Sequence, residues 1–252
     1  RWGGWYVTGA HGKQNHLGNL IVKNRASREA ITKNPDGQNV ASLKGYFDTS
    51  RYLTPHSDIV ALMVLEHQAE AQNLLVRASI QSRLALHQRA LLNKELGQSA
   101  DSYSESTARR IKSVCDPLVR YLLFAGEARL TEKVAGTSTF AVDFAKKGPR
   151  DAKGRSLRDF DLQRRLFKYP CSYLIYSDAF KRLPAETKDH VYQQIYDVLT
   201  DRHYEGGFGH LSPDDRQAIL EILRDTIPEL PEYWRKKSSN RTTGNTGSTG
   251  SD

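Results

Sequence analysis

Apolar residues recur at helical spacing between residues 54 and 97, the longest periodic pattern in the chain. Thr54 stands where an N-cap is expected, with Pro55 at the first helical position, and Gly97 supplies a stop signal. The pattern predicts either two helices with a break or one spine of about 65 Å against which other helices pack. The apolar positions are Ile59, Val60, Met63, Leu74, Leu75, Ile80, Leu84 and Leu91.

Later segments repeat the helical signal over shorter lengths. A helix is predicted from Ser104 to Cys115, followed by a corner at Asp116 and Pro117 that starts a second helix ending at Gly126. Further helical segments are predicted over residues 157–170, 171–183, 186–201 and 211–227. The last of these has Ser212 as N-cap and Pro213 at the first helical position, which makes it one of the clearest helices.

The other segments of the chain lack a helical pattern and separate or flank the predicted helical parts. Residues 1–53 are rich in Gly and aromatics and predict an irregular or β-containing portion that packs on the helices. Residues 127–156 predict a basic linker or excursion, and residues 235–252, made largely of Gly, Ser, Thr and Asn, predict a disordered tail. We therefore expect a mainly α protein, a helical bundle around one long helix, with helical parts at 54–126 and 157–234.

Composition narrows the class of protein. The 252 residues are 38% hydrophobic, enough to bury a core, and no run of eighteen apolar residues predicts a membrane span. The chain begins at Arg1 without a leader, as expected for a portion of a longer product. Cys115 and Cys171 form no CxxC motif, and the sequence leaves open two free thiols or one disulfide.

Much of the net charge of +8 comes from residues 146–168, which hold nine Lys or Arg against three Asp. Such a segment is either a solvated loop or a docking surface for an acidic protein, phosphate or anionic lipid. Nucleic acid is disfavoured as a partner because no aromatic residue between 146 and 158 offers a stacking platform.

The candidate chemistry lies on histidines. His56 and His67 are eleven residues apart, which places them about 20° apart on one helical face with Met63 between them. Their separation of roughly 16 Å along the axis is too large for one metal ion to bridge. His11 and His16 lie in a Gly-containing segment, which can curl so that both imidazoles converge.

Carboxylates flank the helical histidine. Glu66 and Glu70 lie on either side of His67, so either one can orient the imidazole or act as a ligand. The candidate metal ligands are His11, His16, His56, His67 and Glu70. The alternative is that the histidines bond to backbone or carboxylates and that Met63 packs in the core. The motifs HExxH, GxSxG, GxGxxG and the phosphate loop are absent.

A family resemblance rests on the segments WGGWYVTGAHG, HLGN, YLTPHSDIVALMVLEHQ, FDLQRRLFKYPCSYLIYSDAF and LPEYW. At these segments the chain resembles a family of uncharacterised bacterial secreted proteins, relatives of c-type cytochromes with an upstream CxxCH region. The resemblance implies a periplasmic or cell-surface setting and haem attached upstream, with His11, His16, His56 and His67 as candidate ligands. This chain itself holds no CxxCH.

Three functions follow as expectations. The first is an extracytoplasmic electron-transfer protein with a redox protein partner, in which His56, His67 or Met63 contacts haem iron. The second is a metalloenzyme that uses a transition metal ion held by His and Glu. The third is a non-catalytic module whose basic segment docks an acidic protein. The sequence leaves open whether the protein is an enzyme.

Overall fold

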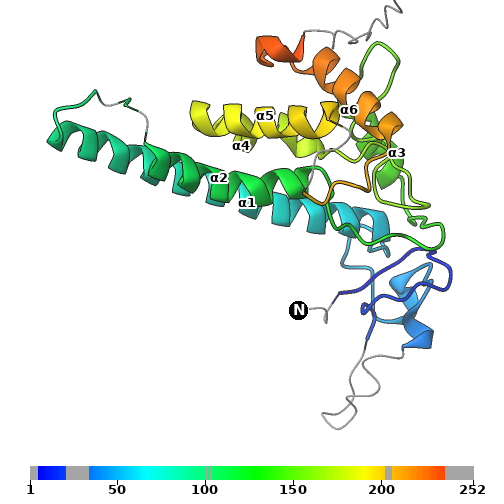
Figure 1. The fold of residues 1–252 in the computed structure, drawn as a ribbon. Helices are drawn as coiled ribbons and strands as arrows, with labels where there is room; N and C mark the ends of the chain where they lie inside the picture. Colours follow the sequence, from blue (N-terminus) through cyan, green and yellow to red (C-terminus); the bar gives the residue numbers. More distant parts are fainter. Residues whose placement is uncertain (1–4, 21–33, 100, 103, 202–205, 236–252) are drawn as a thin grey trace, which may run out of the picture.

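The computed structural model describes residues 5–20, 34–99, 101–102, 104–201 and 206–235. The protein is mainly helical, which confirms the predicted fold class at that level (Figure 1). The α-helices are α1 (Ile59–Glu95), α2 (Glu105–Leu122), α3 (Phe140–Lys146), α4 (Asp178–Lys181), α5 (Ala185–Thr200) and α6 (Pro213–Thr226). Short 3-10 helices are η2 (Pro35–Gly37), η3 (Leu43–Gly45), η4 (Tyr173–Tyr176) and η5 (Glu232–Trp234).

The first helix begins later than predicted. Asp58, not Thr54, is the N-cap of α1, and its carboxylate accepts hydrogen bonds from the N–H groups of Val60 and Ala61. Thr54 instead accepts the N–H of His56 in a turn before the helix. From Ile59 the helix continues for 37 residues without a break, so its length is about 55 Å. His56 therefore lies outside the helix, and the predicted shared face with His67 is wrong.

One face of α1 is buried along its whole length, and it packs on α2 (Figure 1). The buried positions are three or four residues apart, which is the spacing of a helix contact line. Side chains become smaller and more polar toward the far end of this line. Its members are Val60, Val64, His67, Ala71, Leu75, Ala78, Ser82, Ala85, Arg89 and Asn93.

The predicted corner in the second helical segment is wrong. α2 continues through Pro117 as one helix, with Leu118, Val119 and Leu122 buried. Proline in a helix interior removes a hydrogen bond and costs about 3 kcal/mol or more. Packing of the apolar face against α1 and α5 outweighs that local cost.

Residues 157–170 do not form the predicted helix. An antiparallel bridge pairs Phe160 with Phe167, and Leu162 in the tight turn between them has φ +56°. The carboxylate of Asp161 accepts the N–H groups of Gln163 and Arg164, which stabilises the turn. A side chain that binds backbone locally competes with the helix.

Of the next three predicted helices, the first is much shorter than expected and the other two are close to their predicted lengths. Residues 171–183 contain only η4 and the four-residue α4, whose N-caps are Ser172 and Ser177. α5 and α6 match their predictions, and Ser212 caps α6 in a capping box with Asp215.

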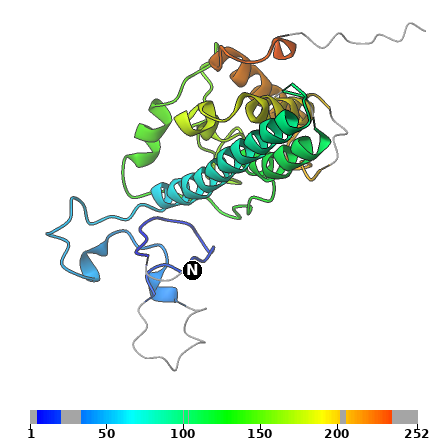
Figure 2. The ribbon, with the colours of Figure 1, turned by 90° about the vertical axis from the view of Figure 1, so that its left-hand side faces the viewer.

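The N-terminal segment lies against the first turn of α1 (Figures 1 and 2). Isolated bridges pair Thr8 with Asp58 and Ala10 with Ala135, but the described residues of 1–53 contain no strand. The predicted linker 127–156 contains α3 and supplies Ala135 to this contact. Most of the predicted tail, residues 236–252, lies outside the described residues.

Two further expectations concern the core and the membrane. Cys115 and Cys171 are free, buried thiols, and burial raises the pKa of each to about 12. Among the described residues, no helix combines the length and apolar character that crossing a bilayer requires.

Candidate functional site

The structure brings His11 and His16 together, with ring centres 4.8 Å apart. Nε2 of His11 accepts the backbone N–H of Asn39, and Nδ1 of His16 accepts the backbone N–H of Gly18, each at 3.0 Å. Burial lowers the pKa of His16, and the nearby His11 lowers it further. Each imidazole thus accepts a hydrogen bond from a backbone N–H group through one ring nitrogen. These two hydrogen bonds help to order the N-terminal segment.

His67 lies in the core, on the buried line of α1. Its ring stacks on Tyr121 and on Phe124, with centroids 5.2 and 4.6 Å away, and its Nε2 lies 2.7 Å from Oγ of Ser172. Burial lowers the pKa of His67 to about 4, so the ring is neutral at pH 7. A neutral imidazole enclosed by aromatic rings is well suited to packing.

The other predicted ligands are separated. His56 is half-buried before α1, and its Nδ1 has no hydrogen-bond partner. Met63 packs against the core, and Glu70 is exposed. No group of three or more His, Cys, Asp or Glu side chains in the described part of the chain is arranged to hold a metal ion.

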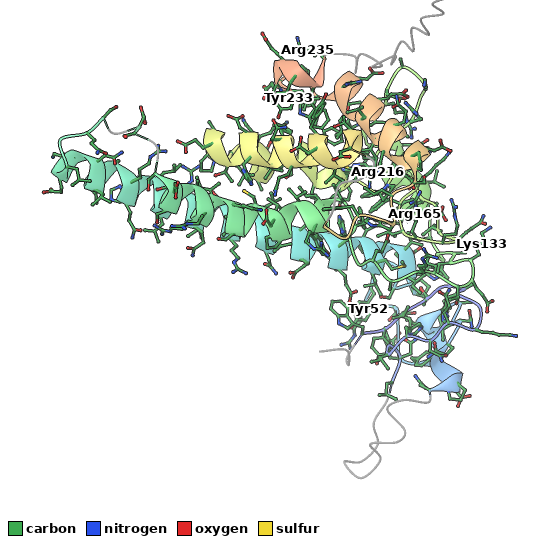
Figure 3. The ribbon with its side chains drawn as sticks, in the orientation of Figure 1. Tyr52, Lys133, Arg165, Arg216, Tyr233 and Arg235 are labelled. Atoms are coloured by element: carbon green, nitrogen blue, oxygen red, sulfur yellow. The ribbon has the colours of Figure 1, made fainter. Side chains whose placement is uncertain are left out.

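The basic segment is largely neutralised within the fold. Arg155 contacts the carboxylates of Asp151 and Glu221, both at 2.6 Å, and Lys153 contacts Glu221 at 2.8 Å. Arg165 pairs with Asp215 beside the start of α6 (Figure 3). Arg150 and Arg164 pair with Asp159 and Asp161, each at 3.1 Å. Much of the positive charge counted in the sequence thus stabilises a loop.

Arg158 differs from the other arginines of this segment. Its guanidinium lies in the corner formed by two nearly perpendicular aromatic rings, 4.4 Å from the centroid of Phe144 and 4.5 Å from that of Tyr173. Within the described residues its side chain has neither a carboxylate partner nor a hydrogen-bond acceptor. Burial lowers the pKa of Arg158, yet a guanidinium keeps its proton at neutral pH.

This guanidinium borders a cavity of about 430 Å³ between α1 and α3. The hydroxyl of Tyr173 donates to Oε1 of Gln68, which leaves the amide N–H groups of Gln68 as donors at the cavity. Lys147 adds a second cation, and Asp143 is the one acidic side chain. The apolar wall consists of Ala61, Val64, Leu65, Phe140 and Phe144.

A larger cavity, of about 830 Å³, lies between the far end of α1, α2, α5 and η5. Two of its charged groups pair, since Arg89 forms a bidentate contact with Glu186, at 3.0 and 2.8 Å. Nε2 of His190 is buried there without a hydrogen-bond partner in the described part of the chain, and burial lowers the pKa of this histidine. Both signs of charge line the space, so it favours no ligand class.

No family model, curated protein or solved structure matches the chain. The sequence does not single out Arg158, because its aromatic neighbours lie outside the basic loop of residues 146–158. Phe144 precedes Lys146, and Tyr173 follows Lys168, so the loop residues alone gave no signal of the aromatic contact.

Proposed function

We propose that this protein is a binding module that captures a small organic anion in the cavity between α1 and α3. The observation that carries the proposal is the guanidinium of Arg158, which is partly buried against two aromatic rings and has no carboxylate partner among the described residues. A partly desolvated cation without a counter-charge is costly, and a bound anion supplies that counter-charge.

The two aromatic rings also restrict how a ligand approaches. Phe144 and Tyr173 meet at 82° with centroids 5.0 Å apart, so they shield the guanidinium of Arg158 from that side, and its N–H groups lie at the edge of the guanidinium plane. A carboxylate fits such an edge with two parallel hydrogen bonds. Lys147 and the amide of Gln68, which line the same cavity, add further donors. The proposed head group is therefore a planar carboxylate.

The rest of the cavity defines the body of the ligand. Aliphatic side chains of α1 and the ring of Phe140 form an apolar wall, which favours a hydrocarbon or aromatic group beside the carboxylate. Asp143 repels additional negative charge, so a singly charged carboxylate is preferred over phosphate. Benzoate combines these features and is a suitable probe.

Calorimetric titration of the full chain with benzoate and with inorganic phosphate tests the proposal. We expect benzoate to bind and Arg158→Gln to weaken its binding at least tenfold, about 1.4 kcal/mol. Lys147→Gln, at the cavity, should weaken binding by a smaller factor, and Lys146→Gln, which does not line it, should leave binding unchanged. Thermal unfolding checks that each variant folds. Absence of benzoate binding, or equal binding by Arg158→Gln, contradicts the proposal.

A second candidate function is electron transfer with haem attached upstream, in a periplasmic or cell-surface setting. The supporting observation is that the buried Nδ1 of His56 has no hydrogen-bond partner among the described residues, whereas His11, His16 and His67 each engage a ring nitrogen within the fold. Haem bound there would supply one-electron chemistry. In protein carrying its native upstream region, His56→Ala should shift the Soret band, whereas His67→Ala should not if it remains folded.

The architecture that accompanies either function is a helical bundle arranged around α1. Its support is that α1 contacts α2, α3, α4 and α5. Residues of both sides of the proposed cavity are positioned on this one helix or against it, so the helix sets the geometry of the site.

A further inference from the structure

The outer face of α1 carries an exposed apolar stripe, which we define as Val76, Ile80, Leu84 and Leu91. Between 43% and 57% of each of these side chains is exposed. At about 100° per residue, the stripe lies opposite the buried line that faces α2. Scattered exposed apolar residues are ordinary, but these four share one face of one helix, where the exposed His87 lies between Leu84 and Leu91.

Opposite charges flank the stripe at matching positions. Glu95 follows Arg77 by 18 residues, which is five turns of helix, so both lie at the same angle beside the stripe. The described residues offer neither of them an ion-pair partner. Along the helix, the point midway between Arg77 and Glu95 is residue 86. The point midway between Ile80 and Leu91 falls within one residue of it, so both pairs share one centre.

From this arrangement we infer that a second copy of the chain binds the stripe, with its α1 antiparallel. A two-fold axis beside residue 86 places Arg77 of each copy on Glu95 of the other, and Ile80 on Leu91. The same surface then serves both copies, as a two-fold interface requires. The overlap of residues 77–95 is about 28 Å long, which suits a small, reversible interface.

Sedimentation equilibrium of the full chain between 1 and 200 µM tests the inference. We expect a monomer–dimer equilibrium that Ile80→Asp weakens at least tenfold, while Val142→Asp, an exposed apolar position on α3, leaves it unchanged. Arg77→Glu and Glu95→Arg should each weaken the dimer severalfold, and the double variant should restore it. A monomer at every concentration overturns the inference.

Single cysteines test the antiparallel register. The native thiols are buried, so an added surface cysteine reacts alone. His87→Cys lies beside the axis and should form a disulfide-linked dimer under mild oxidation. Ile80→Cys is about 18 Å from its own copy and should not, although it should cross-link in a mixture with Leu91→Cys. Efficient self-linking of Ile80→Cys contradicts this arrangement, and circular dichroism verifies the fold of each variant.

Discussion

Nε2 of His67 lies 2.7 Å from Oγ of Ser172, which joins the N-terminal third of α1 to the N-cap of η4 across the core. The hydroxyl also accepts the backbone N–H of Leu174, so one serine both caps η4 and satisfies the buried imidazole. Two groups from distant segments, the imidazole of His67 and the N–H of Leu174, thereby depend on one oxygen. Ser172 directly precedes Tyr173, which lines the cavity.

The protein should lose stability in mild acid because His67 is buried and neutral. Its pKa is about 4 when folded and about 6.5 when unfolded, so the unfolded chain binds a proton that the folded chain excludes. The free energy of unfolding should therefore fall as the pH decreases from 6.5 to 4, by about 3 kcal/mol in total, and the contribution is complete above pH 6.5.

Urea denaturation at a series of pH values measures this dependence. His67→Phe removes the titrating group while keeping a ring in the same place. The difference between wild type and variant isolates the contribution of His67 from those of His16 and His190, whose pKa values burial also lowers. An identical acid slope in wild type and variant would show that His67 is already accessible to protons in the folded state.

Ser172→Ala should destabilise the protein by about 1–3 kcal/mol, because it leaves a buried imidazole nitrogen and the N–H of Leu174 without partners. The matched control is Ser113→Ala, an exposed serine on α2, for which we expect a change within about 0.5 kcal/mol. Equal stabilities of the two variants in chemical denaturation would contradict the structural role given to Ser172.

Gly136→Ala should destabilise the attachment of the N-terminal segment. A methyl group at Gly136 would overlap the carboxylate of Asp58, which also accepts the N–H and the hydroxyl of Ser138. Overpacking of this kind costs about 1–3 kcal/mol. Gly209→Ala, where the added carbon meets no atom within 4 Å, is the control and should be nearly neutral. Limited proteolysis near residue 56 would report on local detachment.

Arg155→Met should be more harmful than Arg164→Met. Burial tends to raise the pKa of Asp151, but hydrogen bonds from Arg155 outweigh it and hold that pKa below its usual value. Removing Arg155 leaves a buried carboxylate unpaired, at a cost of about 3 kcal/mol. Arg164 is largely exposed, so its loss should cost less than about 1 kcal/mol. Thermal denaturation of the two variants compares them directly.

Capping residues in the sequence predicted where a helix begins when the residues that cap it lie within the same turn. Ser212, Pro213 and Asp215 lie within one turn and predict the start of α6 correctly. At α1 the predicted N-cap was Thr54, whereas the structure uses Asp58. Asp58 prevails, because Ser138, eighty residues later in the chain, binds the same carboxylate. Its distant partner is not visible in the local pattern.

The candidate site depended on distant contacts in the same way. Histidine content and spacing predicted His67 as a ligand, which stays untested, but the aromatic rings and the serine that enclose it come from segments more than fifty residues away in the chain. For Arg158 the sequence showed only a member of a basic run. Its distinction from Arg155 arises because Arg155 faces Glu221 on α6 whereas Arg158 faces two rings.

The sequence by itself determined that this chain is mainly helical and where its best-capped helices begin, because those properties depend on hydrogen bonds and side chains within a few residues. Only the tertiary structure decided which of the many cations are neutralised and which of them line a cavity. Ion pairing and desolvation act over a few ångströms in space, between residues such as Arg158 and Phe144 that belong to different elements. Sequence spacing does not encode those distances until the helices have packed.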